Sequence, residues 1–227
     1  MNTLDLARLD RLRVYDTPTL ANAIETIVDR PANTGFTRPP VHSVLPALPP
    51  MVGFAVTVTI RSEPAFADAE AKRDAMLPLY SALAGGRRPQ VVVVQDLDQG
   101  AGCLWGEVNA TICARLGAEG VVTDGLVRDL PDVEAIGFRY LARGVGVARS
   151  NTQVVATDIP VEVGSVRFEP GDLVHADRHG ALLIPVEAVD ELLVAADAVT
   201  ARESRLLAWV RSDAFHPDEL ASRRAQH

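Results

Sequence analysis

Four consecutive valines, Val91–Val94, constrain the fold of this chain more than any other feature. An apolar run without interruption predicts a strand that is buried on both faces, as in a parallel sheet covered by helices. A polar loop follows at 95–100. Residues 106–117 then have helical spacing, and Val121-Val122 forms a second short apolar run. The order strand, helix, strand predicts an α/β fold with a parallel sheet at its centre.

The flanking segments add elements on both sides of this unit. The β-branched alternation of Gly53–Ile60 predicts a strand with one face buried more deeply than the other. Turns at Gly164, Pro170-Gly171 and Gly180 predict a small β unit over 160–180.

Three further segments have helical spacing. They are 3–29, divided into two short helices at Asp16-Thr17-Pro18, 68–84, where Pro78 should kink or split the helix, and 186–211. The prolines of residues 31–51 exclude a helix and predict an irregular arm, which we expect to pack between subunits. The polar tail to His227 should fray.

Length, composition and charge narrow the class of protein. A chain of 227 residues with 48% hydrophobic residues fits one globular domain. The formal charge of −8 argues against nucleic-acid binding, because the average field repels phosphate. No run reaches the roughly 18–20 apolar residues of a membrane span. The first residues lack the apolar core of a signal peptide, so a cytoplasmic location is expected. The spacing of Cys103 and Cys113 matches neither a redox pair nor a zinc pattern.

Candidate chemistry gathers at both ends of the central helix and strand. The helix start offers unpaired N–H groups to a substrate carboxylate, and the candidate substrate-binding residues there are Gly106, Glu107, Val108 and Asn109. Arg128, after the second strand, can hold a carboxylate or enolate through two N–H groups. Asp129 beside it is a candidate ligand for Mg²⁺ or Mn²⁺, since one carboxylate with water and substrate oxygens is enough for Mg²⁺. Asp124 is the nearest candidate to move a proton, through water.

These residue types suit cleavage next to a 2-oxo acid, because a chelated ion polarises the ketone and stabilises the enolate that forms. Each residue also has an ordinary structural interpretation. Arg128 and Asp129 could form a surface ion pair or a helix cap, Asp124-Gly125 is a common turn, and Glu107 could be a solvated first-turn acid.

A longer motif favours the catalytic interpretation. The run GEVNATICARLGAEGVVTDGLVRD, with Gly137-Phe138 after it, resembles the signature of the 4-hydroxy-4-methyl-2-oxoglutarate aldolase family, which also contains the RraA regulators of ribonuclease E. Pro160–Gly180 is similar to the same family. The resemblance covers roughly residues 8–205, with 206–227 as a C-terminal helical tail. The loop 96–105 and the long arm depart from the family's pattern.

The resemblance implies a fold, a reaction and an assembly. It implies an αββα sandwich like the swivelling phosphohistidine domain, in trimers or hexamers with sites at subunit clefts. It also implies a class II pyruvate aldolase, with oxaloacetate decarboxylase activity, that depends on Mg²⁺ or Mn²⁺. The backbone of 106–109 and Arg128 would bind substrate, Asp129 would bind the metal, and Asp124 would match the motif acid.

Two alternatives remain. The first is a non-catalytic RraA-type regulator that binds a ribonuclease. Regulators of that branch lack the acid after the arginine, so the presence of Asp129 favours an enzyme. The second is a metal site at His175, Asp177 and His179, which would share one face of a continuous strand. The sequence Asp-Arg-His-Gly is typical of a turn instead.

Overall fold

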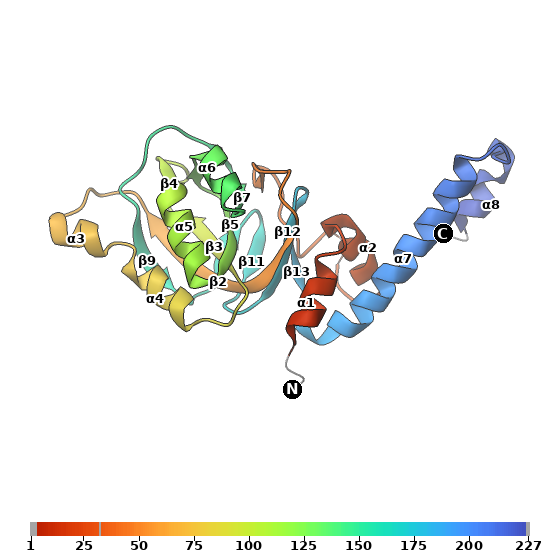
Figure 1. Cartoon of the computed structure of the whole chain (residues 1–227), viewed down its shortest axis with the longest axis horizontal. Coiled ribbons are helices and arrows are strands. Elements are labelled where there is room, and N and C mark those ends of the chain that lie inside the picture. Colours follow the sequence, from red (N-terminus) through yellow and green to blue (C-terminus); the bar gives the residue numbers. More distant parts are fainter. Residues whose placement is uncertain (1–3, 32, 226–227) are drawn as a thin grey trace.

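An eight-stranded mixed sheet forms the centre of the molecule in the computed structural model, which describes residues 4–31 and 33–225 (Figure 1). Its strand order is β1-β7-β5-β3-β2-β12-β13, and β9 also pairs with β2. The strands of this sheet are β1 (His42–Ser43), β2 (Met51–Arg61), β3 (Gln90–Asp96), β5 (Ala118–Thr123), β7 (Arg139–Ala142), β9 (Gln153–Thr157), β12 (Leu173–Asp177) and β13 (Gly180–Ile184). The neighbours β2, β3, β5 and β7 run parallel.

The valine run lies where the sequence predicts it. Val91–Val94 form most of β3 and are fully buried between β2 and β5. The expectation for Gly53–Ile60 is wrong in one respect, because every residue of β2 from Met51 to Ile60 is buried. Its two faces contribute to different cores, so neither meets solvent.

Helices α4 (Leu77–Gly85), α5 (Glu107–Leu116) and α6 (Leu130–Ala135) cover one face of the sheet on the side of the candidate site. Helix α3 (Ala69–Asp74) precedes α4, buries no residue and projects from the sheet (Figure 1). Pro78 splits the expected helix over 68–84, since it occupies the first turn of α4 after the break from α3. Leu79, Leu83 and Cys113 are fully buried against Val92 and Val94 of β3.

The terminal helices pack together at the other end. They are α1 (Leu6–Leu12), α2 (Thr17–Ile27) and α7 (Val189–Val210), preceded by a 3₁₀ turn at Val186–Ala188. Asp16 caps α2 by accepting a hydrogen bond of 2.9 Å from Thr19 N, which confirms the predicted break. The tail does not fray up to residue 225, because a 3₁₀ turn at Pro217–Glu219 and α8 (Leu220–Ala225) fold back beside α7 (Figure 1).

The remaining strands form two small sheets. The predicted β unit contains the hairpin of β10 (Val161–Val163) and β11 (Val166–Phe168) and continues into β12 and β13. The other small sheet is parallel and consists of β4 (Cys103–Trp105), β6 (Leu126–Val127) and β8 (Gly144–Val145). Helices lie on both sides of the strands, and the α/β class with an N-terminal arm and a C-terminal helix is confirmed.

Candidate active site

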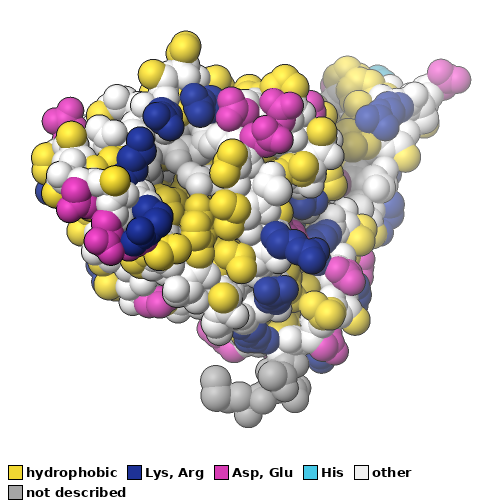
Figure 2. All heavy atoms as spheres, turned by 60° about the vertical axis from the view of Figure 1, so that its left-hand side comes forward, with side chains coloured by type: hydrophobic (Ala, Val, Ile, Leu, Met, Phe, Trp, Pro, Cys, Tyr) yellow, Lys and Arg dark blue, Asp and Glu magenta, His cyan; other side chains and the backbone are white. Residues whose placement is uncertain are grey.

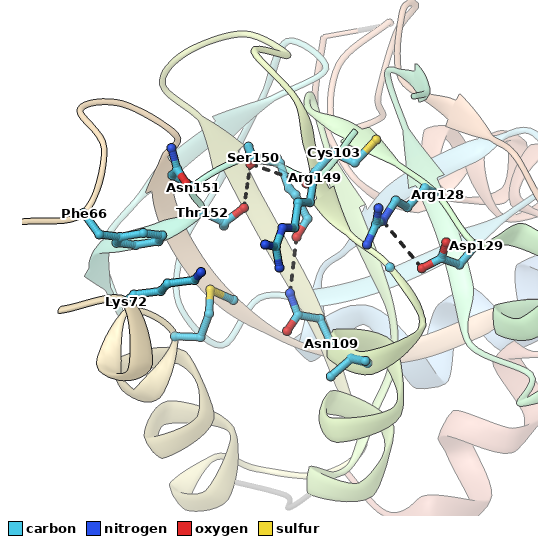
Figure 3. A pocket seen from close by; sticks show the side chains of 14 residues that line it. Phe66, Lys72, Cys103, Asn109, Arg128, Asp129, Arg149, Ser150, Asn151 and Thr152 are labelled. Carbon is cyan, nitrogen blue, oxygen red and sulfur yellow. Dashed lines mark hydrogen bonds and ion pairs between the residues drawn. The ribbon is translucent and has the colours of Figure 1, made fainter. Parts of the chain in front are cut away.

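A cavity of about 330 Å³ opens where the small parallel sheet meets the start of α5 (Figure 3). Its lining includes Gly106, Val108 and Asn109 of the predicted helix start together with Arg128 and Asp129. The structure therefore brings together most of the residues that the sequence singles out. Figure 2 brings forward the left-hand side of Figure 1, where α3 and α4 lie, and shows Lys and Arg side chains around a hollow on this side.

Asp129 points at the start of α5 and not along its own helix. It begins α6 in the left-handed region, with φ of 61°, and its side chain makes no cap hydrogen bond there. Its Oδ2 accepts a hydrogen bond of 3.0 Å from Glu107 N. The carboxylate that occupies the start of α5 in this structure is thus that of Asp129. It fits there because Gly106 has no Cβ, and an added Cβ would collide with it.

Arg128 is fixed by the strand that precedes it. Its N–H donates to Trp105 O at 2.9 Å, which aligns β6 with β4. The guanidinium Nε lies 3.6 Å from Asp129 Oδ2, and Nη1 lies 3.5 Å from Val147 O. These contacts are long, so the donors of Arg128 remain able to bind an anion in the cavity.

Asn109 is held by two hydrogen bonds inside the protein. Its Nδ2 donates to Leu104 O at 3.3 Å, and its Oδ1 accepts from Tyr80 Oη at 2.8 Å. Burial raises the pKa of Tyr80 to about 12, so the phenol keeps its proton and donates. The side chain of Asn109 therefore fixes the cavity wall, and Glu107 contributes its backbone N–H while its side chain is exposed.

Asp124 lies outside the lining of this cavity. Its Oδ1 accepts a hydrogen bond of 2.7 Å from Asp96 N, at the end of β3. Burial raises the pKa of Asp124 to about 6, the charge of Asp96 adds to this, and Arg143 opposes it. The predicted proton carrier and the predicted metal ligand are thus on the same edge of the sheet but in separate surroundings.

Other cavity residues carry no sequence signal. Phe66 and Lys72 come from α3 and the segment before it, and Arg149, Ser150 and Thr152 come from the segment between β8 and β9. No spacing rule connects these segments with 106–129. The buried thiol of Cys103 also lines the cavity, and burial raises its pKa.

The second metal site considered from the sequence is a structural link. His175 is fully buried and its Nδ1 lies 3.1 Å from Thr17 Oγ1. Asp177 accepts hydrogen bonds from Thr17 N at 2.9 Å and His179 N at 2.8 Å. These contacts join β12 to α2.

A metal at the main site would have one protein carboxylate. Within residues 4–31 and 33–225, no three His, Cys, Asp or Glu side chains are grouped to hold an ion. Asp129 lines the cavity, and its Oδ1 makes no hydrogen bond within the described residues. This arrangement fits an ion such as Mg²⁺, which keeps several waters and takes further oxygens from its substrate.

Similarity to solved structures extends over nearly the whole chain. An uncharacterized protein from Pseudomonas syringae is 22% identical with a TM-score of 0.72, covering 99% of this chain and 100% of that one. RraAS2 of Streptomyces coelicolor, described as an unusual member of the RNase ES inhibitor RraA family, is 22% identical with a TM-score of 0.68, covering 93% and 100%. At these identities the similarity shows the fold.

Similarity in sequence to a curated relative is partial. A protein of Halalkalibacterium halodurans, named for an inferred 4-hydroxy-4-methyl-2-oxoglutarate aldolase activity, is 30% identical over 96 residues, which are 42% of this chain and 46% of that protein. The chain spans half or less of the length of the first curated relatives it matches. A family model described as Aldolase/RraA matches residues 17–183, so the chain belongs to the RraA-like family.

Proposed function

We propose that this protein is a divalent-metal-dependent lyase that cleaves a carbon–carbon bond of a 4-hydroxy-2-oxo acid and releases pyruvate, and that it also decarboxylates oxaloacetate. The observation that carries the proposal is the position of Arg128 and Asp129 side by side in one cavity, at the N-terminus of α5. A cation, an acid and a helix start in one cavity can hold a carboxylate next to a metal ion.

Each residue has a separate task in this proposal. Asp129 holds Mg²⁺ or Mn²⁺, and such an ion polarises the 2-oxo group and stabilises the negative charge that develops as the bond breaks. Arg128 grips the substrate carboxylate through its fixed fork of N–H donors. The backbone at Gly106, Val108 and Asn109 supports that carboxylate at the positive end of α5.

The proton step is assigned to Asp124. Cleavage removes a proton from the C4 hydroxyl group and adds one to C3 of the pyruvate product. Asp124 lies outside the cavity lining, so its role requires water between it and the substrate. A pKa of about 6 suits a group that exchanges protons near neutral pH.

The test compares wild type with Asp129→Ala in a pyruvate-release assay. The panel contains 4-hydroxy-4-methyl-2-oxoglutarate, 4-carboxy-4-hydroxy-2-oxoadipate and oxaloacetate, with Mg²⁺, with Mn²⁺ and with chelator. We expect release that the chelator abolishes and a variant whose response to metal is lost. Because Asp129 accepts a single hydrogen bond among the described residues, from Glu107 N, its loss should cost about 0.5–1 kcal/mol of stability, seen as a small shift of Tm.

A regulator that binds a ribonuclease is the alternative. It predicts no pyruvate release from any substrate and a ribonuclease recovered with the tagged protein from a lysate. An Asp129→Ala variant that unfolds early yet responds normally to metal would contradict the ligand assignment.

We also propose that the protein assembles as a trimer or hexamer with the cavity near a subunit boundary. Val108 lines the cavity, and Val147 O lies 3.5 Å from Arg128 Nη1. These two side chains are 71% and 93% exposed, and a neighbouring subunit would cover them. Light scattering should report three or six subunits. An active monomer at micromolar concentration would contradict a shared cleft.

Within the described residues, no helix has the length and apolar character needed to cross a membrane.

A further inference from the structure

We propose that Lys72 and Arg149 form a second anion subsite in the cavity and bind a carboxylate at the far end of the substrate. This inference rests on the proposed function for the near end, where Arg128 and Asp129 lie. It assigns to α3 and to the segment after β8 a role in choosing among 2-oxo acids.

The first observation is that both cations lack partners. Among residues 4–31 and 33–225, the Lys72 ammonium and the Arg149 guanidinium make no hydrogen bond or ion pair. The neighbouring Arg73 shows the contrast, because its guanidinium contacts Asp74 at 2.7 Å and Glu70 at 3.1 Å. In a chain with eight more acidic than basic residues, two unpaired cations at one cavity favour an anionic ligand.

The second observation is their direction. Figure 3 shows Lys72 and Arg149 pointing into the cavity from different walls, while Asp129 lies beyond Arg128 at the other end. The backbone beside Arg149 is fixed, since Cys103 N donates to Ala148 O at 2.8 Å and Ser150 N donates to Cys103 O at 3.2 Å. The backbone on both sides of Arg149 is therefore held in place, and the hydroxyl groups of Ser150 and Thr152, which lie 2.7 Å apart, line the same cavity.

The third observation is the balance of charge. Three cations, Lys72, Arg128 and Arg149, line the cavity with one carboxylate, Asp129. A metal ion at Asp129 would add positive charge. One substrate carboxylate at Arg128 leaves the other two cations unmatched, whereas a second carboxylate would pair with both. A cavity of about 330 Å³ is at the lower end of the roughly 300–1,000 Å³ that small-molecule sites occupy.

The position of Lys72 also makes the inference testable. Helix α3 buries no residue, so substitutions on it should leave the core intact. Lys72 is the only lysine of the chain, so an amine-selective reagent modifies no other side-chain amine. The matched control is Arg73→Gln, which removes a cation from the same helix without touching the cavity.

The experiment measures the binding of pyruvate and of 2-oxoglutarate by calorimetry in the presence of Mg²⁺. Pyruvate has only the near-end carboxylate, and 2-oxoglutarate adds a far one. We expect wild type and Arg73→Gln to bind 2-oxoglutarate more tightly than pyruvate. Lys72→Gln and Arg149→Gln should each weaken 2-oxoglutarate binding by about tenfold, as expected for one charge-assisted hydrogen bond, and leave pyruvate binding unchanged. Lys72→Arg should retain most of the affinity.

A second measurement reports on Lys72 directly and does not depend on Arg128 and Asp129. Acetylation of Lys72, followed by mass spectrometry, should be slowed by 2-oxoglutarate and not by pyruvate. Unchanged 2-oxoglutarate affinity in both Gln variants, with normal pyruvate binding, would overturn the subsite and leave the proposed function standing. Loss of pyruvate affinity in those variants would also overturn it, because the cations would then serve the near end. Protection of Lys72 in a wild-type protein that binds no pyruvate would support the subsite and count against the proposed function.

Discussion

Replacing Asp124 by Asn should stabilise the protein at neutral pH. The Asn side chain keeps an oxygen that can accept the 2.7 Å hydrogen bond from Asp96 N, and it removes the charge that burial and the nearby Asp96 disfavour. The pKa of Asp124 rises from 3.8 to about 6 on folding, so the folded state binds this proton more strongly than the unfolded state. The carboxyl group therefore contributes its full stability below pH 3.8 and loses it as the pH rises through 6.

The pKa difference sets an upper limit of about 3 kcal/mol on the gain from Asp124→Asn above pH 7. Because Asp124 is only partly buried, we expect about 1–2 kcal/mol. Urea unfolding at pH 3, 4, 5, 6 and 7.5 should show almost no gain at pH 3, little at pH 4 and most of it by pH 7.5. The control is Asp213→Asn, which makes the same substitution on the exposed C-terminal turn, away from β3. A variant of Asp124 that is destabilised equally at every pH would refute the reasoning.

Further predictions concern activity. The same Asp124→Asn variant should lose most pyruvate release if Asp124 moves the proton through water, and normal kcat with raised stability would remove it from the mechanism. Arg128→Lys should lower kcat/KM at least ~10²-fold, because Lys lacks the planar fork, and near-normal kinetics would exclude Arg128 from the site. Gly106→Ala should change Tm little, since its φ of −140° suits any residue, yet calorimetry should show weaker binding of metal and pyruvate because the new Cβ displaces the Asp129 carboxylate. Unchanged ligand binding would contradict that packing.

The sequence predicts those parts of the fold that local pattern determines. Val91–Val94, the helix after Gly106 and the break at Asp16 depend on apolar spacing or a cap, and all lie where they are expected. The full burial of β2 could not be read from its alternation. That burial depends on what covers each face, and the covering elements come from both ends of the chain.

Some residues of the candidate site could likewise be predicted from the local sequence and others could not. Gly106 and Asp129 lie within one helix–strand unit, so short connections bring the end of β6 next to the start of α5. Lys72 and Arg149 reach the cavity from segments before and after this unit, and nothing in their local sequence marks them. Asp124 differs from both groups. It belongs to the same motif as Asp129, but its side chain turns toward the end of β3, so its proposed proton transfer runs through water.

The conformation of Asp129 bears on the choice between a ligand and a cap. An Asp that caps its own helix has an extended backbone and accepts from N–H groups of the following turn. Asp129 has φ of 61° and makes no such bond, so stabilisation of α6 does not account for an acid at this position. The carboxylate instead reaches across to α5, where Glu107 N donates to Oδ2, and Asp129 lines the cavity. An added Cβ on Gly106 would collide with the Asp129 carboxylate, so the acid fits at the start of α5 because Gly106 has no side chain, and we propose that the two residues form the site together.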